Sequence, residues 1–253
     1  MKTYQSDKAY INPQTLHLYC NTNQSLLTTP PKAFVLEFPG LGGGSCMGGC
    51  MDIGAYNHGY AAELAKEGIL VAYLFPGPWS WMNRGAVRMV NLVLDAIYEA
   101  YHLTKDTSWV VTGGSMGGLG ALMYCATSGR VPTACLAMCP CTHVPDCLDA
   151  SPDFPRTIVR AVAEYDMPLS EGIKLISPHT YIEQMPHIPY MIVNDGADEY
   201  FPEGMTEGYV ADLREHGHDV TYLCLEGCRH GEITPYAWGQ MVLFMKQQCG
   251  VEA

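Results

Sequence analysis

Short continuous apolar runs recur along the chain, and between them lie longer segments in which apolar residues repeat every three to four positions. The first pattern is typical of strands covered on both faces, and the second is typical of helices. The predicted strands are 33–38, 69–75, 108–113, 134–140, 189–195 and 220–227, and the predicted helices are 60–68, 86–103, 116–129, 205–217 and 235–250. This alternation predicts an α/β fold in which a mostly parallel, doubly wound sheet has helices on both faces.

Two parts of the chain depart from the alternation. The segment 141–187 is too long for a plain connection and is broken by prolines, which predicts a small, cap-like helical insertion over one edge of the sheet. The first thirty residues predict a polar strand or a hairpin. Because 253 residues can bury one large core and no repeat is visible, we expect residues 1–253 to form a single domain.

The charge of the chain argues against one class of partner. Its formal net charge is −12, and affinity for nucleic acids rests on Lys and Arg side chains that neutralise phosphates, so we expect no nucleic-acid partner. We also expect no membrane partner and no secretory signal, since there is no apolar run of eighteen residues and no apolar core near the N-terminus. Eleven cysteines, an odd number and mostly inside apolar runs, favour a reducing cytoplasm. The sequence leaves open whether the chain forms a homo-oligomer.

The clearest chemical signal lies where the third predicted strand meets the next helix. The stretch SWVVTGGSMGGLGALMY places Gly113, Ser115 and Gly117 in a Gly-x-Ser-x-Gly pattern directly between the two elements. In such a sharp turn the central residue is strained and its side chain stands clear of the sheet, while the glycines give room for close helix packing. The helix N-terminus behind it favours negative charge near the serine. We therefore predict that Ser115 is a nucleophile and not an idle residue in a tight turn.

A nucleophilic serine needs a base, and the base needs a group that orients it. His230 follows the last predicted strand in a glycine-flanked loop. Parallel strands bring their carboxyl ends to one edge of a sheet, so Ser115, His230 and an acid from the preceding loop can converge there. Asp198 is the preferred acid, because it lies three residues into that loop; Asp195 and Glu199 are the alternatives, and Asp195 could instead be turned inward or cap the loop.

This ordered set resembles the serine hydrolases of the α/β-hydrolase fold over about residues 33–248. The nucleophile elbow GGSMGG, the acid loop NDGADEYFP and the histidine loop GCRHGE stand in the order of that family. Three further segments are similar to the catalytic domain of prolyl oligopeptidase-like peptidases and related small esterases, namely NRGAVRMVNLVLDAI, SPHTYIEQMPHIPYMIVNDGADEYFP and LREHGHDVTYLCLEG. The resemblance implies a Ser-His-Asp triad that works through an acyl-enzyme intermediate.

The glycine-rich stretch FPGLGGGSCMGGC, residues 38–50, follows the first predicted core strand. It lacks the Lys and Ser/Thr of a phosphate loop, and Ser45 stands where a dinucleotide loop has its last glycine, so we expect no nucleotide cofactor. In the family, a Gly-x pair in this loop contributes one donor to the oxyanion hole, and here Gly40-Leu41 occupies that place. The resemblance thus implies the backbone N–H groups of Leu41 and Met116 as the two donors.

Two patterns offer the residue types of metal ligands: Cys139, Cys141 and His143, and Cys224, Cys228 and His230. Neither has the paired C-x-x-C spacing of a structural zinc site, and alternation along the strands explains most of these cysteines as core residues. We therefore expect no metal and no other cofactor.

Substrate choice is the least determined feature. Trp79, Trp81 and Met82 follow the second core strand and are predicted to wall a substrate pocket, with simple packing on the core as the alternative. Pro39-Gly40 stands where many esterases have His-Gly, and we expect no large N-terminal domain of the kind usual in the peptidases. We expect cleavage of a carboxylic ester of a small molecule; a prolyl oligopeptidase-like aminopeptidase or small-peptide hydrolase is the first alternative, and a catalytically silent binding protein is the second.

Overall fold

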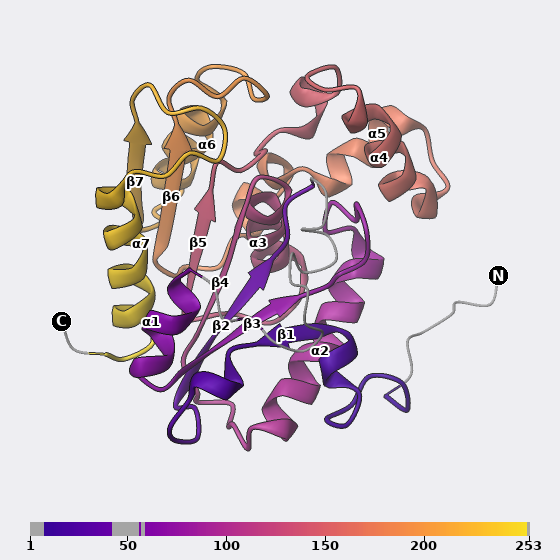
Figure 1. Cartoon of the computed structure of the whole chain (residues 1–253). Helices are drawn as coiled ribbons and strands as arrows, with labels where there is room; N and C mark the ends of the chain where they lie inside the picture. Colours follow the sequence, from indigo (N-terminus) through magenta and orange to yellow (C-terminus); the bar gives the residue numbers. More distant parts are fainter. Residues whose placement is uncertain (1–7, 42–55, 57–58, 252–253) are drawn as a thin grey trace.

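A single sheet organises the chain in the computed structural model, which describes residues 8–41, 56 and 59–251. The strand order is β1-β3-β2-β4-β5-β6-β7, and within it β1 pairs antiparallel with β3 while all the other pairs are parallel (Figure 1). The strands are β1 (Cys20–Thr22), β2 (Ala33–Phe38), β3 (Ile69–Leu74), β4 (Trp109–Gly114), β5 (Ala134–Met138), β6 (Tyr190–Asp195) and β7 (Val220–Leu225).

Helices cover both faces of this sheet, as the sequence predicted. They are α1 (Tyr60–Lys66), α2 (Arg84–Ala100), α3 (Met116–Thr127), α4 (Asp153–Val162), α5 (Leu169–Gly172), α6 (Met205–Glu215) and α7 (Pro235–Gln248). Successive side chains of a strand point to opposite faces. Phe34, Leu36 and Phe38 of β2 accordingly belong to one core cluster with residues of α2, α3 and α6, whereas Val35 belongs to the other with residues of α1 and α7. The mostly parallel α/β architecture is therefore confirmed.

Local chemistry fixes where several helices begin. The Asn83 side chain accepts a hydrogen bond from the Ala86 N–H at 3.0 Å, so α2 starts at Arg84, two residues before the predicted start. Thr234 caps α7 in the same way, with Pro235 at the first helical position, where a missing N–H costs nothing. These caps set the helix ends that apolar periodicity alone does not mark.

The segment between β5 and β6 is the predicted helical insertion. It contains α4, α5 and several 3-10 turns, and Figure 1 shows α4 and α5 near the carboxyl ends of the strands. The Trp81 indole N–H donates to Thr157 Oγ1 at 3.1 Å, and the Asn83 side chain donates to the Ala161 carbonyl at 2.8 Å. The insertion is therefore anchored on the loop that precedes α2, not on an edge strand.

The N-terminal region contributes the short edge strand β1, and its described residues contain no partner strand for a hairpin. Buried Asn23 fixes this region to the sheet: its side chain donates to the Ala61 and Ile69 carbonyls and accepts from the Val71 N–H. Among the described residues, no helix is both long and apolar enough to cross a bilayer.

Candidate active site

Ser115 stands in the sharp turn between β4 and α3. Its φ of 58° and ψ of −123° are unusual for a residue with a side chain, and they place Ser115 directly before the first turn of α3. The backbone holds this conformation: the Ser115 N–H donates to the Met138 carbonyl at 2.9 Å, and its carbonyl accepts from the Leu119 N–H at 3.0 Å. The strain is thus imposed by the strand on one side and the helix on the other.

Glycine is required on both sides of this turn because backbone passes very close. A Cβ on Gly117 would lie 2.2 Å from the Phe38 carbonyl oxygen, and one on Gly113 would lie 2.5 Å from the Gly117 carbonyl group. Phe38 ends β2 and is the register partner of Gly113 on β4. The chain that leaves β2 toward Leu41 therefore starts in contact with the elbow that carries Ser115.

The imidazole of His230 connects Ser115 with Asp198. Its Nε2 lies 2.9 Å from Ser115 Oγ, and its Nδ1 lies 2.7 Å from Asp198 Oδ2. An ionised carboxylate only accepts hydrogen bonds, so Nδ1 carries the proton and the lone pair of Nε2 faces the serine hydroxyl. The His230 and Asp198 side chains are 13% and 6% exposed, which shields both bonds from competing water.

Asp198 is itself held by the loop that bears it. Its Oδ1 accepts the backbone N–H groups of Tyr200 at 2.8 Å and Phe201 at 3.1 Å, which leaves Oδ2 for the imidazole. The rings of Tyr200 and Phe201 meet His230 edge to face, with centroids 5.0 and 5.1 Å away. These contacts fix the orientation of both the acid and the base.

The two alternative acids also reach the histidine loop, but through its backbone. Asp195 is 1% exposed, and its Oδ2 accepts the Gly231 N–H at 2.6 Å. Glu199 accepts the His230 N–H at 3.1 Å and pairs with Arg229 at 2.7 Å. Of the three acids considered from the sequence, Asp198 is therefore the one placed against the imidazole.

Burial and hydrogen bonding shift the pKa values of Asp195 and Glu199 in different directions. Burial raises the pKa of Asp195, while the Gly231 N–H and the neighbouring Cys139 thiol act in the opposite direction. The hydrogen bond from the His230 N–H lowers the pKa of exposed Glu199. Burial also raises the pKa of the Cys139 thiol, so Cys139 is held as a neutral thiol beside the site.

The two groups predicted for the oxyanion hole come from different elements, and their role stays a prediction. Met116 is the first residue of α3, so its N–H cannot find a carbonyl within the helix. Leu41 follows the contact between β2 and the elbow and packs partly buried against the core. The rest of the glycine-rich stretch, including Ser45, lies outside the described residues.

The three residues predicted to wall a pocket lie in different environments. Trp79 is 44% exposed, whereas Trp81 and Met82 are 1% and 3% exposed. Trp81 packs its ring on Phe154 of the insertion, with the centroids 5.5 Å apart. Trp81 and Met82 thus join the core to the insertion, and a substrate contact for this group stays a prediction.

Sequence reasoning did not place Cys139 near this site, because the cysteine sits in an apolar run and was expected to be a core residue. It directly follows β5 with a φ of 35° and is 1% exposed. Its sulfur lies within 4.8 Å of a carboxylate oxygen of Asp195 and a ring nitrogen of His230. Its position after a strand that ends at the same sheet edge was the available signal.

Comparisons with known proteins agree with this architecture. No family model matches the sequence, and no curated protein matches it. Among solved structures, puromycin hydrolase superposes with a TM-score of 0.70 at 17% identity, over 89% of this chain and 35% of its own. Pyrococcus horikoshii acylaminoacyl peptidase gives 0.65 at 14% identity, over 87% and 37%. Esterase B from Lactobacillus rhamnosis gives 0.65 at 12% identity, over 88% and 78%.

These neighbours confirm the α/β-hydrolase fold that the motifs predicted. They include both peptidases and an esterase, so the resemblance stated from the sequence holds at the level of the fold. The chain spans little more than a third of the length of the first two neighbours.

Proposed function

We propose that this protein is a serine hydrolase that cleaves a carboxylic ester of a small substrate. The observation that carries the proposal is the continuous connection from Ser115 Oγ to His230 Nε2 at 2.9 Å and from His230 Nδ1 to Asp198 at 2.7 Å. The strained serine, its base and its orienting acid come from three separate loops at one sheet edge. Such a set has the parts that a nucleophilic serine requires.

In the proposed first step, Ser115 Oγ attacks the acyl carbonyl carbon while His230 Nε2 takes the hydroxyl proton. The imidazolium that forms is stabilised by the Asp198 carboxylate. The bond to the alcohol then breaks, and His230 returns its proton to the leaving alkoxide. This leaves an acyl group on Ser115 and a neutral imidazole.

The negative charge of the tetrahedral intermediate would be met by the N–H groups of Met116 and Leu41. Donors that are already oriented toward the developing charge need little reorganisation during the reaction. Water then loses a proton to His230 Nε2 as it attacks the acyl carbon and forms a second tetrahedral intermediate. The bond from that carbon to Ser115 Oγ then breaks, and His230 returns the proton to Oγ. Release of the acid restores the starting state.

Ester hydrolysis is proposed ahead of peptide hydrolysis. The likeness to esterase B, with a TM-score of 0.65, supports the ester. An aminopeptidase or small-peptide hydrolase uses the same triad chemistry and is the second candidate, supported by the likeness to acylaminoacyl peptidase, whose TM-score is also 0.65.

A fluorophosphonate probe tests the hydrolase proposal. The probe forms a phosphorus–oxygen bond with an activated serine and releases fluoride, so wild type should be labelled and Ser115→Ala should not. Equal labelling of Ser115→Ala would assign the reactivity to another residue. Absence of labelling in both would favour a silent binding protein on this fold.

A substrate panel separates the two hydrolase candidates. Short and long acyl esters should be cleaved with kcat/KM well above that for aminoacyl amides of similar size. Cleavage of the amides with no turnover of any ester would replace the esterase proposal by the peptidase one. His230→Ala serves as the background control, since it keeps the fold and removes the base.

A further inference from the structure

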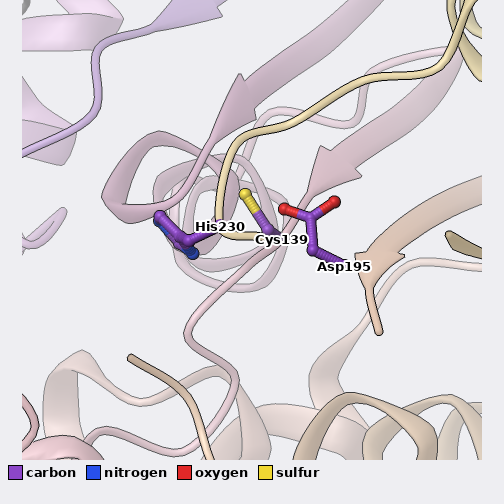
Figure 2. A group of neighbouring side chains, drawn as sticks. All are labelled: Cys139, Asp195 and His230. Atoms are coloured by element: carbon purple, nitrogen blue, oxygen red, sulfur yellow. The ribbon is translucent and has the colours of Figure 1, made fainter. Parts of the chain in front are cut away.

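Three side chains with the chemistry of zinc ligands converge at the sheet edge that carries the proposed nucleophile. Cys139 follows β5, Asp195 ends β6 and His230 lies in the loop after β7. One ligand atom from each lies within 4.8 Å of the other two, and Figure 2 shows the cysteine sulfur facing the carboxylate beside the imidazole. Three different elements contribute one residue each, so no local sequence motif announces the cluster.

We propose that Cys139, Asp195 and His230 form a site for a thiophilic divalent cation, Zn²⁺, whose binding removes His230 from the triad and inhibits the enzyme. A thiolate, an imidazole nitrogen and a carboxylate oxygen are the three donor types that zinc prefers. The inhibition rests on the proposed hydrolase function, whereas the binding itself does not.

The spacing of the cluster is close to what zinc needs. With metal–ligand bonds of about 2.0–2.3 Å, ligand atoms in a tetrahedral site lie roughly 3.3–3.8 Å apart. The three atoms lie within 4.8 Å, so the side chains must close by at most about 1.5 Å to reach that geometry. Water would supply the fourth ligand, as it does in open zinc sites.

The charge balance of the cluster favours a divalent cation. Asp195 is 1% exposed, and its Oδ1 has no hydrogen-bond partner in the described part of the chain. Cys139 is also 1% exposed. When Zn²⁺ enters, the Cys139 S–H bond breaks, its proton passes to solvent, and a zinc–sulfur bond forms. The thiolate and the carboxylate then neutralise the two positive charges, and burial no longer opposes ionisation of either group.

Zinc binding and the triad must compete for the same imidazole. His230 Nδ1 is bonded to Asp198 and Nε2 to Ser115, so coordination through either nitrogen breaks one of the two bonds. The loss of either bond leaves the serine without a correctly oriented base. Inhibition therefore follows whichever nitrogen binds the metal.

A pair of surface histidines away from the proposed site provides a matched control. The rings of His143 and His179 lie 5.3 Å apart on the surface, where His143 pairs with Asp146 and His179 with Asp212. Both histidines are exposed enough to bind zinc weakly, with side-chain exposures of 34% and 49%. His179→Ala removes this competing surface site and leaves the proposed zinc ligands unchanged.

The binding experiment uses the full chain carrying Ser115→Ala, so that turnover plays no part. Zn²⁺ is titrated in competition with a chromophoric chelator, and Co²⁺ is titrated separately to look for a thiolate-to-cobalt charge-transfer band. We expect one Zn²⁺ per chain and a band that disappears in Cys139→Ser. Because even outer-shell partners of a metal typically change affinity about 10–100-fold, Cys139→Ser should weaken zinc binding more than about tenfold. His179→Ala should leave both signals unchanged.

Inhibition is then measured on wild type as loss of fluorophosphonate labelling in the presence of Zn²⁺ and its recovery with a chelator. Cys139→Ser should need more than about ten times the zinc concentration for the same loss, by the same loss of a ligand. Unchanged zinc affinity in Cys139→Ser together with no charge-transfer band would overturn the site. Asp195→Asn provides a second variant if Cys139→Ser does not fold, and it should weaken zinc binding in the same assay. A protein that is never labelled contradicts the hydrolase proposal, while the two metal titrations still decide the zinc site.

Discussion

The backbone N–H of Gly231 donates a 2.6 Å hydrogen bond to Asp195 Oδ2, one residue beyond the histidine whose ring is held by Asp198. Two carboxylates, one at the end of β6 and one in the loop after it, thus support His230 in different ways. Asp198 binds the imidazole, and Asp195 binds the backbone that carries it. The second contact is buried, so its loss cannot be replaced by solvent without rearrangement of the loop.

Because Asp195 acts through its hydrogen bond to the backbone, two substitutions at Asp195 should differ in their effects. Asp195→Ala removes the acceptor and should lower kcat by about 10²-fold, the effect of roughly 1 Å of misplacement, with little change in KM. Asp195→Asn keeps a carbonyl oxygen for the Gly231 N–H and should retain most of the activity. Steady-state kinetics on the best ester substrate gives both numbers. Equal losses in the two variants would show that the charge of Asp195, and not its hydrogen bond, is what matters.

Replacement of Asp198 should be far more severe. Asp198→Asn keeps the size of the side chain but stabilises the wrong imidazole tautomer, and such a change lowers kcat by about 10⁴-fold in a working triad. Glu199→Gln is the matched control, because its amide oxygen can still accept the His230 N–H at the exposed end of the loop. A loss in Glu199→Gln as large as that in Asp198→Asn would move the role of the acid to Glu199.

Much of this arrangement follows from the sequence because strong local signals coincide. β2 lies at 33–38 as predicted, because a short continuous apolar run is typical of a strand that is buried on both faces of a sheet. The Gly-x-Ser-x-Gly pattern located Ser115 at the elbow for a similar reason. At Gly113 and Gly117, a residue with a Cβ would clash with the backbone of Phe38 or of the elbow itself, so only glycine fits there.

The finer assignments depend on tertiary contacts that no local pattern encodes. Asp195, Asp198 and Glu199 are chemically alike, and the fold of their loop decides which one meets the imidazole. Trp81 has its hydrogen-bond partner Thr157 in the insertion, 76 residues away in sequence. Long-range packing of this kind is visible only in the structure.

The Leu41 donor can be tested by removing its N–H. Leu41→Pro should lower kcat by about 10²–10³-fold, the usual effect of losing one donor of an oxyanion hole. Leu41→Ala keeps the N–H and truncates only a partly buried side chain, so its kcat should stay within about tenfold of wild type, a loss below that of a donor. Activity of Leu41→Pro at the Leu41→Ala level would place the second donor elsewhere.

Two glycine substitutions, one at the elbow and one inside α7, should have opposite effects on the stability of the fold. Gly117→Ala puts a Cβ 2.2 Å from the Phe38 carbonyl oxygen and should destabilise the fold by about 1–3 kcal/mol while lowering kcat. Gly239 lies inside α7 with nothing within 4 Å of an added Cβ, so Gly239→Ala should stabilise by about 0.5–1 kcal/mol. Urea unfolding of both variants measures the difference. A Gly117→Ala protein as stable as wild type would contradict the observed contact.

Glu37 predicts an unusual dependence of stability on pH. It lies on β2 among tyrosines, and burial raises the pKa of its carboxyl to about 7, partly offset by hydrogen bonds from Tyr60 and Tyr56. A raised carboxyl pKa means that the folded state binds more protons than the unfolded state between pH 4.5 and about 7. The free energy of unfolding contributed by this group therefore falls as pH rises through that range and is level above it.

Glu37→Gln keeps the shape of the protonated side chain and cannot ionise. It should match wild type in stability near the acidic end of the window and exceed it at higher pH by up to about 3 kcal/mol, as a shift from 4.5 to about 7 implies. Urea unfolding of both proteins at about pH 5 and about pH 8 gives the comparison. A stability difference that is the same at the two pH values would mean that Glu37 does not titrate in this range, and that its tyrosine partners stabilise the charged form more strongly than burial opposes it.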